Sequence, residues 1–456
     1  MQRKAGEIQP GLRWGPFTLR IPFIHTKPAW PELFQGIFIC AATSMALTPV
    51  MMNSFGLTFE EAVAAAAIHS ALINFGPIFC GEPYAAGWIT PTLPFIFAWV
   101  LSDQFTTPEM RFQAMTAISL DFAAVMFLLG ITGMGKRFVN MVPRTLKSGI
   151  ILGSAIAAFL KILDLKDAKN ALATMPISAT IAIVTCLLLA FSEPVAELKK
   201  RYRIVRIIAD LGFLPGFVLA GLIGPLFGEI HFDIQWGFMV PPVGALWDKA
   251  SPFSIGWPSV DMFISGLPLA LIAYILSFGD ILTGDAVIES VADKRPDEKI
   301  DINVTRTHYS VALRNLLMAI FAPFFPTQGV LWTGVHVIIV NKWAQGRDKM
   351  DSIYSGISSF YLFGLPVIYF TLPLITLVKP LLGIALILAV GLTAFACAYV
   401  GQAIVKTPIE RGVSFMIGIV LALFDPWIGI VFGIAATLLL THLNVKEGKG
   451  SGAAAH

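Results

Sequence analysis

The stretch FAPFFPTQGVLWTGVHVII, residues 321–339, decides how this chain can fold. It is apolar enough to enter a membrane, yet it contains two prolines, two glycines, a glutamine and two threonines. An unpaired backbone amide or carbonyl costs several kcal/mol in hydrocarbon, so a plain membrane-spanning helix would not be interrupted in this way. The stretch therefore predicts a broken helix whose free backbone groups find partners elsewhere in the protein.

The composition of the whole chain indicates a membrane protein with many spans. Of its 456 residues, 56% are hydrophobic and only 13% are charged, and the mean hydropathy is +0.75. Soluble globular proteins carry about 25% charged residues, so that class is excluded. The net charge of +3 does not indicate nucleic-acid binding, because the basic residues lie in short clusters between apolar runs. No P-loop motif is present, so we expect no direct use of ATP.

Hydropathy windows of about 20 residues predict about fourteen spans in an all-α polytopic membrane protein. Alternate loops hold the basic clusters, which predicts that both termini are cytoplasmic, in a plasma (inner) membrane. The expected parts are a cytoplasmic N-terminal segment (1–30), a first seven-span repeat (31–230), an outer linker loop (231–258), a second seven-span repeat (259–444) and a C-terminal tail that resembles a cloning remnant (445–456).

An echo of the opening stretch lies in the first half of the chain. Residues 75–94 read FGPIFCGEPYAAGWITPTLP and share its order of Phe, Pro and Phe followed by Gly, Trp and Thr. The two stretches fall in the third and tenth expected spans, and an odd number of spans per repeat inverts the second copy. Interrupted segments at matching positions of inverted repeats indicate a transporter binding site. We therefore expect two strand-like breaks that pair near the bilayer midplane and aim two half-helix N-termini at a cavity.

Polar side chains inside the spans are the candidates for chemistry, because an ionisable group in a membrane is costly unless it has a function. The candidate substrate-binding residues are Thr43, Trp88, Thr90, Asp280, Gln328, Trp332 and Thr333, and the candidate proton-coupling residues are Glu82, Asp280 and Asp285. Asp280 either lines the cavity or is a helix-end acid near the cytoplasmic surface. Glu82 is either a proton site or a brace of the first break. No metal-ligand spacing or catalytic arrangement is present, so we expect no cofactor, metal or enzyme activity.

The two indoles also have two interpretations. Trp88 and Trp332 lie at comparable places in the two breaks, where they would stack on a flat substrate while Gln328, Thr90 and Thr333 supply hydrogen bonds. Alternatively, both belong to the aromatic belts at the membrane surfaces.

The layout of interrupted third and tenth spans resembles the fold shared by nucleobase permeases of the xanthine/uracil and adenine/guanine/hypoxanthine types, sulfate permeases, and bicarbonate and borate transporters. FGDILTGDAVIESV, residues 278–291, is similar to the eighth-span stretch of the purine permeases. The resemblance implies a core domain of spans 1–4 and 8–11 that moves against a gate domain of spans 5–7 and 12–14. One departure is that Leu331, Trp332 and Thr333 stand where nucleobase permeases typically carry a Glu.

We therefore expect a secondary active transporter: a proton-coupled uptake symporter for a nucleobase-like substrate. The alternative is a transporter of a small anion (sulfate, bicarbonate, borate or an organic acid), favoured by the paired helix N-termini. A third possibility is a channel or a non-transporting sensor. We expect H+ rather than Na+ as the coupling ion. Small residues in spans such as 381–402 favour close packing, which suits a homodimer.

Overall fold

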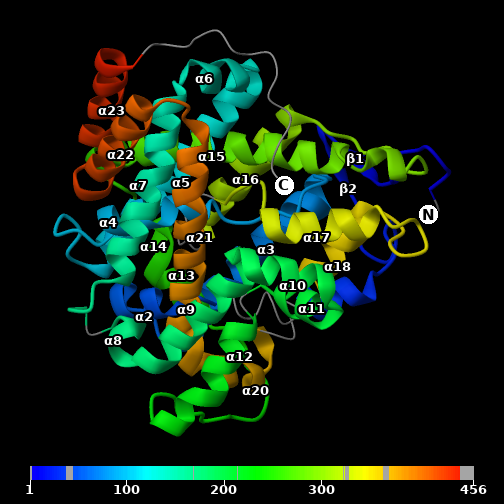
Figure 1. Ribbon diagram of the computed structural model, residues 1–456, viewed down its shortest axis with the longest axis horizontal. Coiled ribbons are helices and arrows are strands. Elements are labelled where there is room, and N and C mark those ends of the chain that lie inside the picture. The colour runs from blue at the N-terminus through cyan, green and yellow to red at the C-terminus, as the bar shows by residue number, and fades with distance from the viewer. Residues whose placement is uncertain are drawn as a thin grey trace.

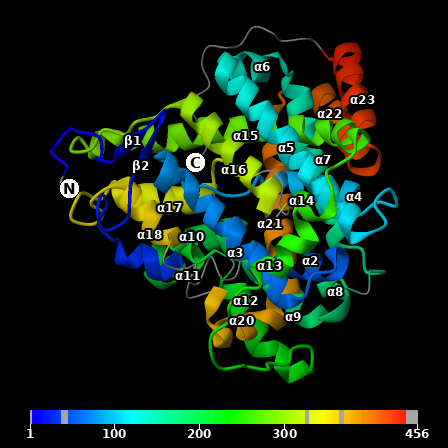
Figure 2. The ribbon, with the colours of Figure 1, turned by 180° about the vertical axis from the view of Figure 1, so that it is seen from behind.

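The computed structural model describes residues 3–36, 45–167, 169–212, 214–321, 323, 328–362 and 369–441, and most of them are helical (Figures 1 and 2). The stretches in this part that are long and apolar enough to cross a membrane number five: Phe59–Cys80, Pro108–Thr132, Arg144–Ile162, Val260–Lys294 and Leu372–Ile404. Two bent helix pairs raise the number to up to seven. The chain has the make-up of a polytopic membrane protein, whereas the count of about fourteen spans and their inverted repeats stay predictions.

The helices of the first half are α2 (Thr48–Phe55), α3 (Phe59–Phe75), α4 (Leu93–Val100), α5 (Pro108–Thr132), α6 (Gly135–Met141), α7 (Arg144–Ile162), α8 (Ala171–Thr174), α9 (Pro176–Phe191), α10 (Glu193–Arg201), α11 (Arg203–Asp210) and α12 (Leu214–Ile223). Those of the second half are α13 (Val243–Ala250), α14 (Pro252–Ile255), α15 (Val260–Glu289), α16 (Val304–Phe321), α17 (Thr333–Trp343), α18 (Ile353–Leu362), α20 (Leu372–Val378), α21 (Leu382–Ile404), α22 (Pro408–Leu423) and α23 (Pro426–Leu440). The short turns between them are η1 (Gly76–Cys80), η2 (Thr90–Thr92), η3 (Gly224–Phe227), η4 (Ala292–Lys294) and η5 (Lys379–Leu381).

Capping residues determine where two of these helices begin. At the start of α3, Thr58 and Glu61 form a capping box in which each side chain accepts the backbone N–H of the other residue. Thr407 and Glu410 repeat this arrangement at the start of α22. Each box satisfies two of the N–H groups that a helix start leaves without an intrahelical partner.

The described helices pack in two groups. In one group α5 lies against α15 and α16, which carry part of the candidate site. In the other, α7 lies against α21 and α22, and α9 lies against α12 and α21. The first group belongs to spans expected in the core domain and the second to spans expected in the gate domain. Packing does not show which part moves, so this division stays a prediction.

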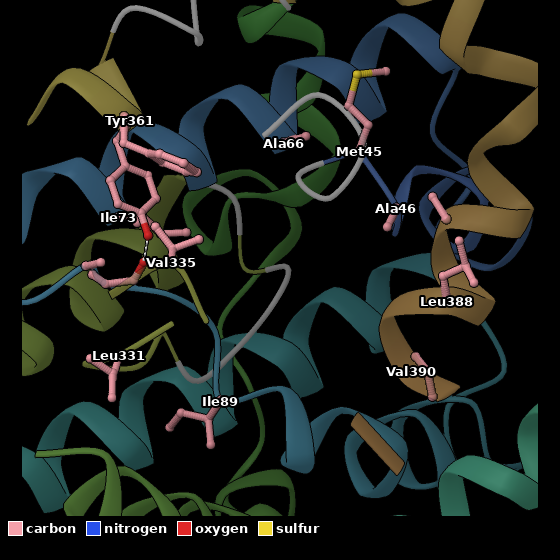
Figure 3. Packing of buried hydrophobic residues seen from close by; sticks show 14 of the residues in the cluster. Met45, Ala46, Ala66, Ile73, Ile89, Leu331, Val335, Tyr361, Leu388 and Val390 are labelled. Carbon is pink, nitrogen blue, oxygen red and sulfur yellow. Dashed lines mark hydrogen bonds between the residues drawn. The ribbon is translucent and has the colours of Figure 1, made fainter. Parts of the chain in front are cut away.

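Apolar side chains fill the interior in two buried clusters. One cluster joins the two breaks to α18 and α21 through residues such as Ile89, Leu331, Tyr361 and Leu388 (Figure 3). The other lies among α2, α4, α5 and α15. In a bilayer this packing gains little from the hydrophobic effect, because lipid tails are as apolar as the side chains. Close van der Waals contact therefore holds the helices together.

The N-terminal segment contains an antiparallel hairpin that the all-helical prediction did not include. It consists of β1 (Leu12–Trp14) and β2 (Phe17–Leu19), and Figures 1 and 2 show it near α17 and α18. After the hairpin, the buried Arg20 donates to the carbonyl of Gly81 at 3.2 Å and lies over the ring of Tyr354. The segment expected to be a polar tail thus packs on the start of the first break.

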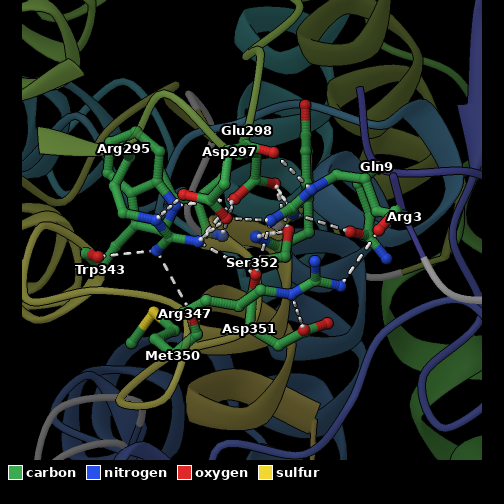
Figure 4. A network of polar contacts seen from close by, with 12 residues as sticks. Arg3, Gln9, Arg295, Asp297, Glu298, Trp343, Arg347, Met350, Asp351 and Ser352 are labelled. Carbon is green, nitrogen blue, oxygen red and sulfur yellow. Dashed lines mark hydrogen bonds and ion pairs between the residues drawn. The ribbon is translucent and has the colours of Figure 1, made fainter. Parts of the chain in front are cut away.

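Ion pairs tie this segment to the loops that follow α15 and α17 (Figure 4). Arg3 pairs with Asp297 at 2.7 Å and with Glu298 at 2.9 Å, and Arg295 pairs with Asp297 at 2.7 Å. The hydrogen bond from Arg295 lowers the pKa of Asp297. The same network contains Gln9, Trp343, Arg347, Met350, Asp351 and Ser352. It joins segments that the charge pattern places on one side of the membrane.

Candidate functional site

The two interrupted spans meet in a short antiparallel pair, which confirms the sequence prediction that the breaks pair with each other. A β-bridge joins Trp88 to Gln328. The backbone N–H of Gly329 donates to the carbonyl of Gly87 at 2.7 Å. Each break thus supplies partners for the other, although they lie more than 200 residues apart in the sequence.

Three more residues form hydrogen bonds with backbone groups of the first break. The carbonyl of Ala85 accepts the N–H of Trp332 at 2.6 Å, and the N–H of Ala85 donates to Nδ1 of His336 at 3.3 Å. The hydroxyl of Tyr361 donates to the carbonyl of Ala86 at 2.6 Å (Figure 3). Buried backbone groups in a membrane need such partners, so the fold depends on them.

Side chains of α16 satisfy the second break. Asn315 accepts the N–H of Gln328 at 2.9 Å and donates its amide to the carbonyl of the same residue at 3.0 Å. Arg314 donates to the carbonyl of Gly329 at 3.1 Å. Side chains of α16 therefore supply hydrogen-bond partners for the described part of the second break at Gln328 and Gly329.

Two glycines permit the close approach of the breaks. A Cβ placed at Gly87 would lie 2.8 Å from the Cβ of Trp332, and one at Gly329 would lie 2.7 Å from the side chain of Ile89. Real Cβ atoms do not approach so closely, so a larger residue would force the pair apart. The two glycines thus have a packing role.

Each break leads directly into a short helix. The first continues as η2 and α4, and the second as α17. The residues that precede these helices, Ile89 and Trp332, supply no capping side chain. The start of α17 therefore keeps backbone N–H groups that no residue at the N-cap satisfies, at the positive end of the helix dipole. The start of η2 offers fewer, because Pro91 has no N–H and the N–H of Thr92 donates to the carbonyl of Ile89.

The start of α17 also opens onto free space. Thr333, its first residue, is exposed, and so is Gly334. A Cβ at Gly334 would meet no described atom within 4 Å. Uncapped N–H groups at an exposed helix start are a ready site for an anion.

Glu82 lies buried at the beginning of the first break. Its carboxylate pairs with Arg314 at 3.7 Å and accepts a hydrogen bond from Ser310 at 2.8 Å. Because Arg314 also bonds Gly329, this pair ties the first break, α16 and the second break together. The geometry favours the interpretation of Glu82 as a brace, and its role in proton coupling stays a prediction.

Asp285 also braces the first break, because its carboxylate accepts a hydrogen bond from the buried hydroxyl of Tyr84. One residue earlier, a Cβ at Gly284 would lie 2.8 Å from the ring of Tyr84. The helix α15 therefore packs closely on the break at this level. The sequence predicted that Asp285 approaches the cytoplasmic surface, and the structure shows it in α15, where it contacts the first break.

Asp280 lies within α15 and not at its end. The helix continues to Glu289, because apolar residues follow Asp280 at helical spacing. The carboxyl of Asp280 is half-buried and makes no hydrogen bond or ion pair with the described residues. Cys397 of α21 interacts with both Asp280 and Ser154, and Ser154 donates to the carbonyl of Pro91. Asp280 therefore lies near the start of the first half-helix.

The two indoles pack on different helices. The ring of Trp88 meets His69 of α3 edge-on at 5.6 Å, and that of Trp332 meets Phe360 of α18 edge-on at 6.4 Å. The amide of Gln328 is buried and donates to the carbonyl of His69 at 3.1 Å. Stacking of either indole on a flat substrate therefore stays a prediction.

The structure describes one of the two remaining candidate site residues. Thr90 is half-buried in the first turn of η2, and Thr43 lies outside the described residues. Sequence reasoning missed Tyr84, Asn315 and Tyr361, which hold the breaks. In the sequence each of them is a polar residue inside or beside an apolar run. That pattern marks them as candidates but does not show which backbone group each one binds.

A cleft lies between α2 and α4 on one side and α7, α8 and α21 on the other. Its empty volume, the open mouth included, is about 810 Å³. At its edge Lys161 pairs with Asp167 at 2.9 Å, and Lys169 donates to the carbonyl of Asn53 at 3.1 Å. The cleft thus separates helices of the expected core from those of the expected gate. Within the described ranges, no three His, Cys, Asp or Glu residues form a group that could hold a metal.

Comparison with known proteins places the fold. No protein-family model matches the sequence, and no curated protein matches it. Among solved structures, the transmembrane domain of the cyanobacterial bicarbonate transporter BicA matches with a TM-score of 0.51 and 17% identity, over 88% of this chain and 96% of that one. SLC26A9 matches with a TM-score of 0.52 and 15% identity, over 90% of this chain and 65% of that one. The chain therefore has the fold of the BicA transmembrane domain and of the matching part of SLC26A9.

Proposed function

We propose that the protein is a secondary membrane transporter that carries a small anion by alternating access between its core and gate parts. The observation that carries this proposal is the uncapped, open start of α17 beside the paired breaks. Its free N–H groups and the helix dipole suit a negative charge. The fold shared with a bicarbonate transporter supports the same class of substrate.

Asp280 gives the proposed transport a coupling mechanism. An ionised carboxylate beside a bound anion repels it, whereas a protonated one can donate a hydrogen bond to it. We therefore assign Asp280 the uptake of one proton as the anion binds, which makes the protein a proton–anion symporter. The helix α15 contacts both η2 and α17, so it links Asp280 to the half-helices that follow both breaks.

Nucleobase symport is the second candidate. It is favoured by Asp280 and by the purine-permease-like sequence around it. Against it, the second break has no carboxylate at Leu331, Trp332 or Thr333, and the two indoles pack on separate helices. The comparisons favour the anion.

The test is uptake into proteoliposomes of labelled bicarbonate, sulfate, hypoxanthine and uracil, with and without an inward proton gradient. We expect gradient-stimulated uptake of an anion that is lost in Asp280→Asn. Asp261→Asn is the matched control, because Asp261 is exposed in the first turn of the same helix. Gradient-stimulated uptake of a base alone would refute the anion proposal, and anion uptake that Asp280→Asn leaves unchanged would refute the coupling role.

Three further expectations from the sequence belong to this proposal. They are a location in the plasma (inner) membrane, two cytoplasmic termini and a homodimer. Cysteine labelling from each side of the membrane tests the termini, and light scattering of the purified protein tests the dimer.

A further inference from the structure

Two helices of the chain have no buried side chain among the described residues. They are α10 and α11, which are nine and eight residues long. The helix α10 meets α9 at a bend of 66°, so the chain turns away from the direction of the span. Helices this short are marginal when they stand alone in water. Among the described residues the two helices pack on each other and α10 packs on α9, and their other faces are left uncovered.

The helix α11 has an apolar side and a basic side. Ile204, Ile207 and Ile208 are 71%, 50% and 41% exposed. At 100° per residue, Arg206 lies nearly opposite Ile204 and Ile208, and Arg203 lies on the flank beside Ile207. A helix with this division lies in the plane of a membrane surface, with its apolar face among the acyl chains.

The basic side chains of this pair are not neutralised by the protein. Three acidic and five basic residues belong to the two helices: Glu193, Glu197, Lys199, Lys200, Arg201, Arg203, Arg206 and Asp210. Lys200 pairs with Glu197, and Lys199 donates to the carbonyl of Leu189. The remaining arginines form no ion pair with a described residue.

We propose that α10 and α11 form a binding surface for anionic phospholipid headgroups. Arg201, Arg203 and Arg206 contact the phosphates, and the exposed isoleucines of α11 enter the acyl boundary. Guanidinium groups bind phosphate oxygens in pairs, so charge and geometry both match this ligand. The charge pattern along the chain assigns the surface to the cytoplasmic leaflet, where anionic lipids gather. The proposal does not depend on which substrate the protein carries.

The test measures binding of fluorescent phosphatidylglycerol to the purified full-length protein in neutral detergent, with phosphatidylcholine and inorganic phosphate as separate arms. Each basic residue near an anionic surface contributes about fivefold to affinity. The triple variant Arg201→Gln/Arg203→Gln/Arg206→Gln should therefore weaken phosphatidylglycerol binding by about a hundredfold. The matched triple change of the same residues to Lys should keep most of the affinity, and Lys166→Gln, on an exposed loop expected on the other side, should keep all of it.

The outcomes separate the sources of the ligand. Binding that prefers phosphatidylglycerol, falls with salt and is lost in the triple Gln variant supports the proposal. Equal binding of phosphatidylcholine, or no loss in the triple variant, would overturn it. Competition by inorganic phosphate at the concentration of the lipid would also overturn it, because the surface would then be a simple anion site. Retention of the proteoliposome uptake activity in neutral lipid shows that the triple variant is folded.

Discussion

The substitution Asn315→Leu tests whether side chains of the neighbouring spans stabilise the broken backbone. It keeps the branching of the side chain at Cγ, although Leu is larger, and removes the two hydrogen bonds to Gln328, at 2.9 and 3.0 Å. Both backbone groups are then left unpaired in a buried site. Each unsatisfied buried group costs about 1–3 kcal/mol, so the free energy of unfolding should fall by about 2–6 kcal/mol.

The assay is thermal unfolding in detergent, followed by intrinsic tryptophan fluorescence, together with uptake into proteoliposomes. For a chain of this length the expected loss corresponds to a fall of roughly 3–10 °C in the apparent Tm. Uptake should fall further, because the second break positions the start of α17. The control is Thr393→Val, because the Thr393 hydroxyl donates to the carbonyl of Ala389 in its own helix, at 2.8 Å.

In the control no backbone group loses its helical partner, so we expect a loss of about 1 kcal/mol or less. Equal Tm values for Asn315→Leu and Thr393→Val would refute the reasoning. The backbone of Gln328 would then be satisfied without Asn315, and the paired breaks would be held by other contacts.

Three further predictions follow from the same structure. Gly87→Ala places a methyl group 2.8 Å from Trp332 and should separate the breaks, with loss of uptake; normal uptake would show that the pair tolerates the shift. Glu82→Leu leaves Arg314 buried without its partner and should cost about 3–5 kcal/mol in chemical unfolding, whereas adding Arg314→Met should restore part of the loss; no restoration would contradict the pairing. The hydrogen bond from Arg295 lowers the pKa of Asp297 in the folded protein. The ionised Asp297 therefore stabilises the fold above the ordinary Asp pKa of about 3.9, and this stabilisation is lost as pH falls through the lowered pKa of Asp297 in the folded protein. Between about pH 6 and about pH 3 the Tm of the wild type should therefore fall more than that of Asp297→Asn, and parallel curves would exclude this contribution.

The sequence alone predicted the class of protein and the place of the two breaks. Composition does this because hydrocarbon tolerates few charges, so long apolar runs can only be spans. Gly, Pro and Thr inside residues 75–94 and 321–339 interrupt helices for local reasons, so their effect is visible without a fold. The pairing of the breaks followed from the need to satisfy backbone groups in lipid, and the bridge between Trp88 and Gln328 confirms it.

Only the tertiary structure decided which polar residues brace the site and which remain available. Glu82 and Asp285 look alike in sequence to Asp280, yet they bond Arg314 and Tyr84, whereas Asp280 has no such partner among the described residues. A hydrogen bond between residues about 200 positions apart leaves no trace in local pattern or spacing. Whether a buried polar group is a brace or a candidate for binding depends on its partner, and folding alone supplies that partner.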